Sequence, residues 1–120
     1  MIWIKRIGLI LLIICLGTVI DYFVHHLSPY FSVPASYFPH KIWYGTLWAF
    51  VGYLIFRKFI KTPFWLAFTI ALTPSVLLQT MYFIQKHQLP WVVLLFLFLH
   101  FLMFLLPGYF ICKRFREIYI

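Results

Sequence analysis

Four long runs of apolar residues follow one another along the chain, separated by short polar or proline-rich segments. A helix needs about 20 mainly apolar residues to cross a hydrocarbon core ~30 Å thick, and each run approaches that length. The pattern predicts an all-α polytopic membrane protein, in which residues 1–120 form a single domain of four transmembrane helices. We expect the helices at about residues 7–24, 41–57, 63–84 and 91–111.

The long connection, residues 25–40, contains Pro29, Pro34 and Pro39. Proline opposes regular helix, and the residue before it is biased towards extended backbone. The segment also carries several tyrosines and phenylalanines, whose rings suit the headgroup layer of a membrane. We therefore expect a loop that lies on the membrane surface.

The second predicted helix, residues 41–57, is short for a transmembrane span, and Lys41 and Arg57 at its ends can extend towards the two interfaces. Small residues recur along one side of this helix with the spacing i, i+4, i+7. Such a stripe lets helix backbones approach closely in a membrane, so we assign it a role in helix packing. Its members are Gly45, Ala49 and Gly52.

The composition supports a membrane protein over a water-soluble one. The chain is 65% hydrophobic and only 10% charged, whereas soluble domains average about 25% charged residues. A soluble domain of this size has too much surface to cover with so few polar side chains.

The net charge of +8 is concentrated in short clusters between the apolar runs, and not along one helix face as nucleic-acid binding requires. Cytoplasmic loops of membrane proteins carry an excess of lysine and arginine. The sequence therefore predicts a multi-pass protein with both termini cytoplasmic, and no nucleic-acid partner. The predicted cytoplasmic side receives Lys5, Arg6, Arg57, Lys58, Lys61, Lys113, Arg114 and Arg116, and the other side Lys41 and Lys86.

Ionisable residues gather at the predicted outer face. Asp21 lies about one turn inside the end of the first helix, and His25 shares its helical face. A carboxylate at this depth needs a cation, so we expect Asp21 to contact at least one of His25, His40 or Lys41. Two interpretations stay open: a structural ion pair, or a metal site formed by Asp21, His25, His26 and His40.

His100 lies in the middle of the fourth apolar run and needs a hydrogen-bond partner there. Threonines at 62, 69, 73 and 80 fall on one side of the third predicted helix. We therefore expect His100 to bond with Thr69, Thr73 or the carbonyl of Ile70. Together with Asp21, the residues His100, Thr69 and Thr73 are the candidates for a ligand-binding or proton-linked site.

No nucleotide-binding loop, serine-hydrolase motif or carboxylate pair occurs in the chain, and Cys15 and Cys112 lie in apolar runs without a CxxC arrangement. We expect no cofactor, and a non-enzymatic helical bundle that binds membrane lipids or a partner membrane protein, including a second copy of itself. Two alternatives remain: a metal-dependent membrane enzyme or metal carrier with its site at the outer face, and a small transporter with a midplane site near His100.

Overall fold

The computed structural model describes residues 2–27, 36–86, 90–115 and 118. The fold of these residues is all-helical. It consists of α1 (Ile2–His25), α2 (Tyr37–Phe56), α3 (Pro63–Lys86) and α4 (Pro90–Arg114).

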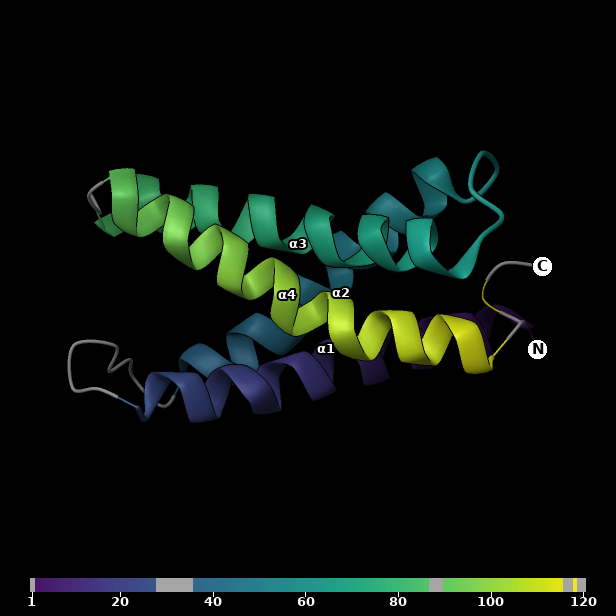
Figure 1. The fold of residues 1–120 in the computed structure, drawn as a ribbon, viewed down its shortest axis with the longest axis horizontal. Helices are drawn as coiled ribbons and strands as arrows, with labels where there is room; N and C mark the ends of the chain where they lie inside the picture. The colour runs from purple at the N-terminus through teal and green to yellow at the C-terminus, as the bar shows by residue number, and fades with distance from the viewer. Residues whose placement is uncertain (1, 28–35, 87–89, 116–117, 119–120) are drawn as a thin grey trace.

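The helices run antiparallel in sequence order, and both chain termini lie at the same end of the bundle (Figure 1). Each helix packs on two others: α1 on α2 and α4, and α3 on α2 and α4. Figure 1 also shows α4 crossing from the side of α3 to the side of α1. We call the end that holds the termini the terminal end, and the opposite one the distal end. The described chain measures 42 × 22 × 19 Å, and its length matches a bilayer of ~40–45 Å with headgroups included.

The core lies along the bundle axis and is built from all four helices. It combines branched aliphatic side chains of α1 with alanines of α2 and α3 and with Phe104 of α4. The fully buried members include Ile10, Ile13, Ile14, Ala49, Tyr53, Leu66, Ala67, Ile70, Ala71 and Phe104.

Two helices begin earlier than the sequence predicts. The first starts at Ile2 and continues through Lys5 and Arg6, because Arg6 is buried with its guanidinium 4.6 Å from the centre of the Trp3 ring. The second starts at Tyr37 and holds Pro39 in its first turn. Proline is tolerated there, since the first N–H groups of a helix have no intrahelical partner. The predicted loop 25–40 is therefore too long at both ends, and residues 28–35 lie outside the described part of the chain.

The small-residue stripe of α2 faces the interior, where Gly45, Ala49 and Gly52 are all buried. A Cβ atom on Gly52 would overlap the side chain of Thr73 in α3, and one on Gly45 would lie 3.2 Å from Cγ2 of Ile14 in α1. The two glycines thus let α2 approach two neighbouring helices.

Within the described residues, three helices are long and apolar enough to cross a membrane: Ile2–His25, Pro63–Met81 and Trp91–Arg114. The second helix, α2, is not among them, because its first two turns hold Pro39, His40 and Lys41. Large apolar side chains nevertheless cover the outside of all four helices. Among the exposed ones are Leu12, Leu16, Val19, Leu47, Leu54, Leu72, Val76, Leu94, Phe98 and Leu106. Water-soluble monomers rarely expose apolar patches beyond a few hundred Å².

Candidate functional site

A buried ion pair joins α1 to α2 in the distal half of the bundle. Nζ of Lys41 lies 2.6 Å from Oδ2 of Asp21, and both side chains are 0% exposed. The sequence-based expectation that Asp21 contacts His25, His40 or Lys41 is confirmed. The expectation that Lys41 extends towards the interface is wrong, since α2 starts one turn before Lys41 and turns its ammonium inward.

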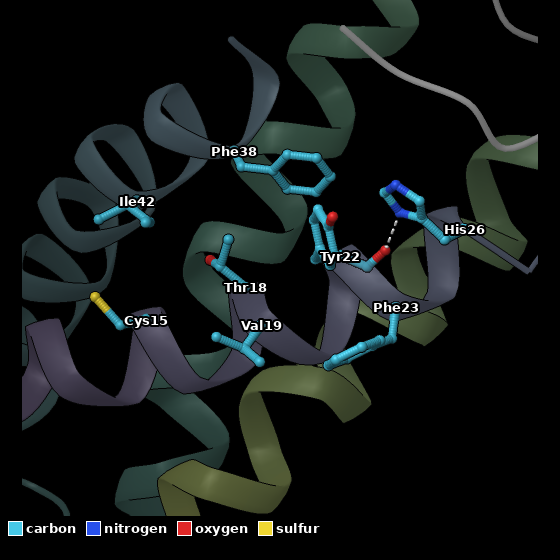
Figure 2. Close-up of a pocket in the computed structure, with 8 residues that line it drawn as sticks. All are labelled: Cys15, Thr18, Val19, Tyr22, Phe23, His26, Phe38 and Ile42. Atoms are coloured by element: carbon cyan, nitrogen blue, oxygen red, sulfur yellow. Dashed lines mark hydrogen bonds between the residues drawn. The ribbon is translucent and has the colours of Figure 1, made fainter. Parts of the chain in front are cut away.

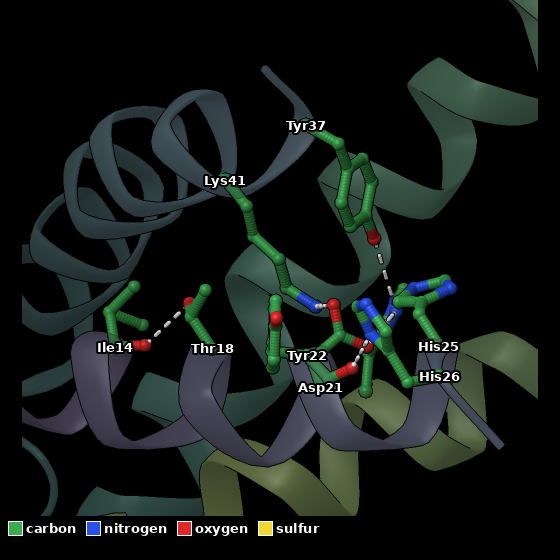
Figure 3. Close-up of polar contacts among 9 residues, drawn as sticks. Ile14, Thr18, Asp21, Tyr22, His25, His26, Tyr37 and Lys41 are labelled. Carbon is green, nitrogen blue, oxygen red and sulfur yellow. Dashed lines mark hydrogen bonds and ion pairs between the residues drawn. The ribbon is translucent and has the colours of Figure 1, made fainter. Parts of the chain in front are cut away.

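Two histidines approach the other oxygen of the same carboxylate. Nε2 of His25 lies 3.3 Å from Oδ1 of Asp21, and Nε2 of His100 lies 3.4 Å from it. The hydroxyl of Tyr37 lies 3.4 Å from Nε2 of His100. We call these five residues the polar cluster; Figure 3 shows Asp21 between Lys41 on one side and His25 on the other, with Tyr37 above. The cluster links α1, α2 and α4.

Aromatic rings surround the polar cluster. The ring of His25 stacks on Phe96 at 6.1 Å between centroids and meets the ring of Tyr37 edge-on at 5.2 Å. The ammonium of Lys41 lies 5.2 Å from the ring centre of Phe104. Rings in these positions exclude water and strengthen the attraction between the charges, and the face of Phe104 adds a cation–π contact.

The four residues predicted to form a metal site do not come together. His26 is exposed, and its Nδ1 donates a hydrogen bond to the Tyr22 carbonyl at 2.7 Å. His40 is also exposed, and its ring lies 5.8 Å from that of Tyr44. Only Asp21 and His25 of the predicted set meet, because successive histidines on a helix point about 100° apart. His100 supplies the second imidazole instead.

The expected bonds between His100 and α3 are also wrong. Thr69 donates to the carbonyl of Trp65 at 3.1 Å, and Thr73 donates to the carbonyl of Thr69 at 2.9 Å. Threonine in a helix often satisfies its hydroxyl in this way, so neither residue needs a partner on α4. Because α4 crosses towards α1 (Figure 1), His100 faces Asp21.

A groove of about 630 Å³ lies beside the polar cluster, between α1 and α2. Its lining is almost entirely apolar, and Figure 2 shows it bounded by the Tyr22 and Phe38 rings near the distal end. These two rings meet edge-on, with their centres 5.3 Å apart. The lining consists of Cys15, Thr18, Val19, Tyr22, Phe23, His26, Phe38 and Ile42.

Sequence reasoning missed this groove, although a signal for it exists. Cys15, Thr18 and Val19 are spaced i, i+3, i+4, so they lie on one face of α1. Their side chains are small, and the larger Tyr22 follows one turn later. A row of small side chains that ends at a large ring leaves a hollow on the helix surface.

The two features have distinct chemistry. The carboxylate and two imidazoles of the polar cluster are donors that divalent metal ions accept, whereas the groove suits an apolar chain.

No protein-family model, no curated protein and no solved structure matches this chain.

Proposed function

We propose that this is an integral membrane protein with four spans and cytoplasmic termini, which binds one acyl chain of a lipid in the groove between α1 and α2. Its role is binding and not catalysis. The observation that carries the proposal is the groove itself, an apolar hollow of about 630 Å³ on the outside of the bundle. That volume is within the ~300–1,000 Å³ of ligand-binding pockets in general.

The charge distribution supports the membrane orientation. The basic side chains described at the terminal end come from the start of α1, the α2–α3 turn and the end of α4. At the distal end Lys41 is neutralised in the interior by Asp21. Among the described residues, the basic side chains at the surface are thus concentrated at the terminal end, which favours that end as cytoplasmic.

The position of the groove favours a lipid as its occupant. From Cys15 to His26 the groove follows α1 for about 16 Å at ~1.5 Å per residue. This length is close to half of a hydrocarbon core ~30 Å thick, which is one leaflet. The exposed imidazole of His26 lies at the distal end of the groove, where a headgroup would meet it.

The polar cluster supports the groove mechanically. Tyr22 and Phe38, which line the groove, directly follow Asp21 and Tyr37 in the sequence. The ion pair between Asp21 and Lys41 therefore fixes α1 against α2 at the groove wall. A preformed wall lowers the entropic cost of binding a flexible chain.

The experiment compares two tryptophan variants on lipid-facing helix surfaces. Val19→Trp fills the groove, and Val76→Trp places the same side chain on the exposed face of α3. Each protein is purified in mild detergent, and the retained lipid is counted by native mass spectrometry. We expect wild type and Val76→Trp to retain lipid equally and Val19→Trp to lose most of it while its melting temperature is unchanged.

Equal lipid retention by both variants contradicts the proposal. The proposal is also contradicted if the wild-type protein shows a dimer mass in place of a lipid adduct and only Val19→Trp loses this dimer. The groove would then hold a second copy of the protein.

The orientation is tested by labelling single cysteines in intact cells. Leu27→Cys lies at the exposed distal end of α1 and Lys58→Cys in the exposed α2–α3 turn. A membrane-impermeant thiol reagent is expected to label position 27 before permeabilisation and position 58 only afterwards. Labelling of both positions from the same side contradicts a four-span arrangement.

A further inference from the structure

We infer that Asp21, His25 and His100 form a binding site for a divalent transition-metal ion. Zinc is the ion used to test it. The site lies inside the bundle and shares no residue with the groove lining, although its Asp21 also belongs to the ion pair beside the groove wall. The three residues are buried and come from α1 and α4.

The distances between the three side chains fit a shared metal ion. Nε2 of His25 and of His100 lie 3.3 and 3.4 Å from Oδ1 of Asp21, beyond the usual ~2.7–3.2 Å of an N–H···O bond. Zinc holds nitrogen and oxygen at about 2.0–2.2 Å, so neighbouring ligands of a tetrahedral ion are ~3.3–3.6 Å apart. One ligand atom from each of the three residues lies within 4.8 Å of the other two.

Tyr37 lies beside one of the three ligand atoms, with its hydroxyl 3.4 Å from Nε2 of His100. When the imidazole carries its proton on Nδ1, Nε2 has one lone pair, which accepts either the Tyr37 hydroxyl proton or a metal ion. An ion bound by His100 therefore displaces this hydrogen bond.

The donor set selects the class of ion. Two imidazoles and one carboxylate suit zinc and neighbouring first-row metals, whereas calcium and magnesium require sites made mainly of oxygen. Three protein ligands leave one position of a tetrahedral ion open to water or another ligand. His25 is the last residue of α1, so an ion would enter from the distal end.

Lys41 limits the affinity of this site. Its ammonium already neutralises Asp21 at 2.6 Å, and it repels any cation that binds to the other carboxylate oxygen. Lys41→Met keeps an apolar stem of similar length and removes this competitor. The variant also leaves Asp21 without its cation, so a bound metal then supplies the missing positive charge.

The test measures metal binding by the full-length chain in detergent. Zinc affinity is obtained by competition with a chelator dye, and bound cobalt is observed through the visible absorption of a tetrahedral ion. The cluster variants are His100→Leu, His25→Ala and Lys41→Met; the control is His40→Ala, which removes an exposed histidine of α2.

We expect wild type and His40→Ala to bind one zinc ion with equal affinity. Removal of an outer partner of a metal ligand costs about 10–100-fold in affinity, so loss of a ligand in His100→Leu or His25→Ala is expected to cost at least tenfold. If His100→Leu does not fold, His25→Ala still tests the site, because His25 lies at the end of a helix. Lys41→Met is expected to bind zinc more tightly than wild type and to show the larger rise in melting temperature with zinc.

The inference is overturned if His40→Ala loses zinc binding, or if both His100→Leu and His25→Ala bind zinc with unchanged affinity. It is also overturned if zinc does not stabilise the Lys41→Met protein. Val19→Trp separates the two proposals, since it is expected to lose lipid and keep zinc. Retained lipid with no zinc binding overturns only the metal site.

Discussion

The terminal and distal halves of the bundle are held together by different interactions. In the terminal half, the helices pack closely: a Cβ on Gly52 of α2 would overlap the side chain of Thr73 in α3. In the distal half, Lys41 reaches from α2 to Asp21 in α1, and the polar cluster continues to α4.

In the proposed membrane location, the difference follows from the way in which helices associate in lipid. Lipid tails are as apolar as leucine side chains, so membrane helices associate through close packing and polar contacts. Close packing leaves no space, and the region around Gly52 has none. Lys41 reaches α1 with a long side chain, and the groove between α1 and α2 lies beside this contact. The half that is held by charges is therefore the half with space for a ligand.

Removal of the buried lysine is expected to have the largest effect on stability. Lys41→Met leaves the Asp21 carboxylate buried without a cation, and breaking a buried pair in this way costs about 3–5 kcal/mol. Thermal unfolding in detergent without added metal measures the loss. Lys58→Met, at an exposed lysine, is the control and should change stability little. Equal effects of the two variants would mean that the charge of Lys41 does not hold the distal half.

A methyl group at Gly52 tests the packing of the terminal half. Gly52→Ala forces Thr73 or the α2 backbone to move, and overpacking of this kind costs about 1–3 kcal/mol. The matched control is Gly8→Ala, because no atom lies within 4 Å of a Cβ built there. Since alanine favours helix over glycine by roughly 0.5–1 kcal/mol, Gly8→Ala should unfold at the same or a higher temperature. A stable Gly52→Ala protein would show that close approach is not required.

The smallest expected effect concerns the end of the chain. The buried hydroxyl of Tyr53 donates a hydrogen bond to the carbonyl of Ile118, which ties the C-terminal segment to α2. Tyr53→Phe keeps the ring and removes the bond, for a loss of about 0.5–1.5 kcal/mol. Tyr44→Phe, at an exposed tyrosine, is the control. Limited proteolysis of the C-terminus should be faster only in Tyr53→Phe. An unchanged cleavage rate in this variant would argue against the hydrogen bond between Tyr53 and Ile118.

The helices could be predicted from the sequence, because long apolar runs bounded by basic residues and prolines leave few alternatives. The helix ends could not. The sequence places Arg6 before the first predicted helix, but stacking on Trp3 lets the helix continue through it. It places Pro39 in the predicted loop, but this residue occupies the first turn of α2, where proline is tolerated.

Half of the candidate site could be predicted, for a local reason. Asp21 and His25 are four residues apart on one helix, so their contact follows from helical geometry. The contact between Asp21 and His100 depends on the crossing of α4 towards α1, which no local pattern encodes. A signal did exist: the one aspartate of the chain and a histidine within an apolar run both needed a polar partner. The groove depends on the distance between α1 and α2, which only the assembled bundle defines.

The central claim is that Asp21 and Lys41 form an ion pair inside the bundle, since this pair fixes both the groove wall and the carboxylate of the proposed metal site. A double-mutant cycle measures it most directly, with Asp21→Asn, Lys41→Met and the double variant unfolded in detergent without metal. Contacting residues show coupling energies of roughly 0.5–3 kcal/mol, and we expect a value in the upper half of that range, so that the double variant is less destabilised than the sum of the two single substitutions. Effects of the two single substitutions that simply add would contradict the ion pair, and with it the account of the distal half.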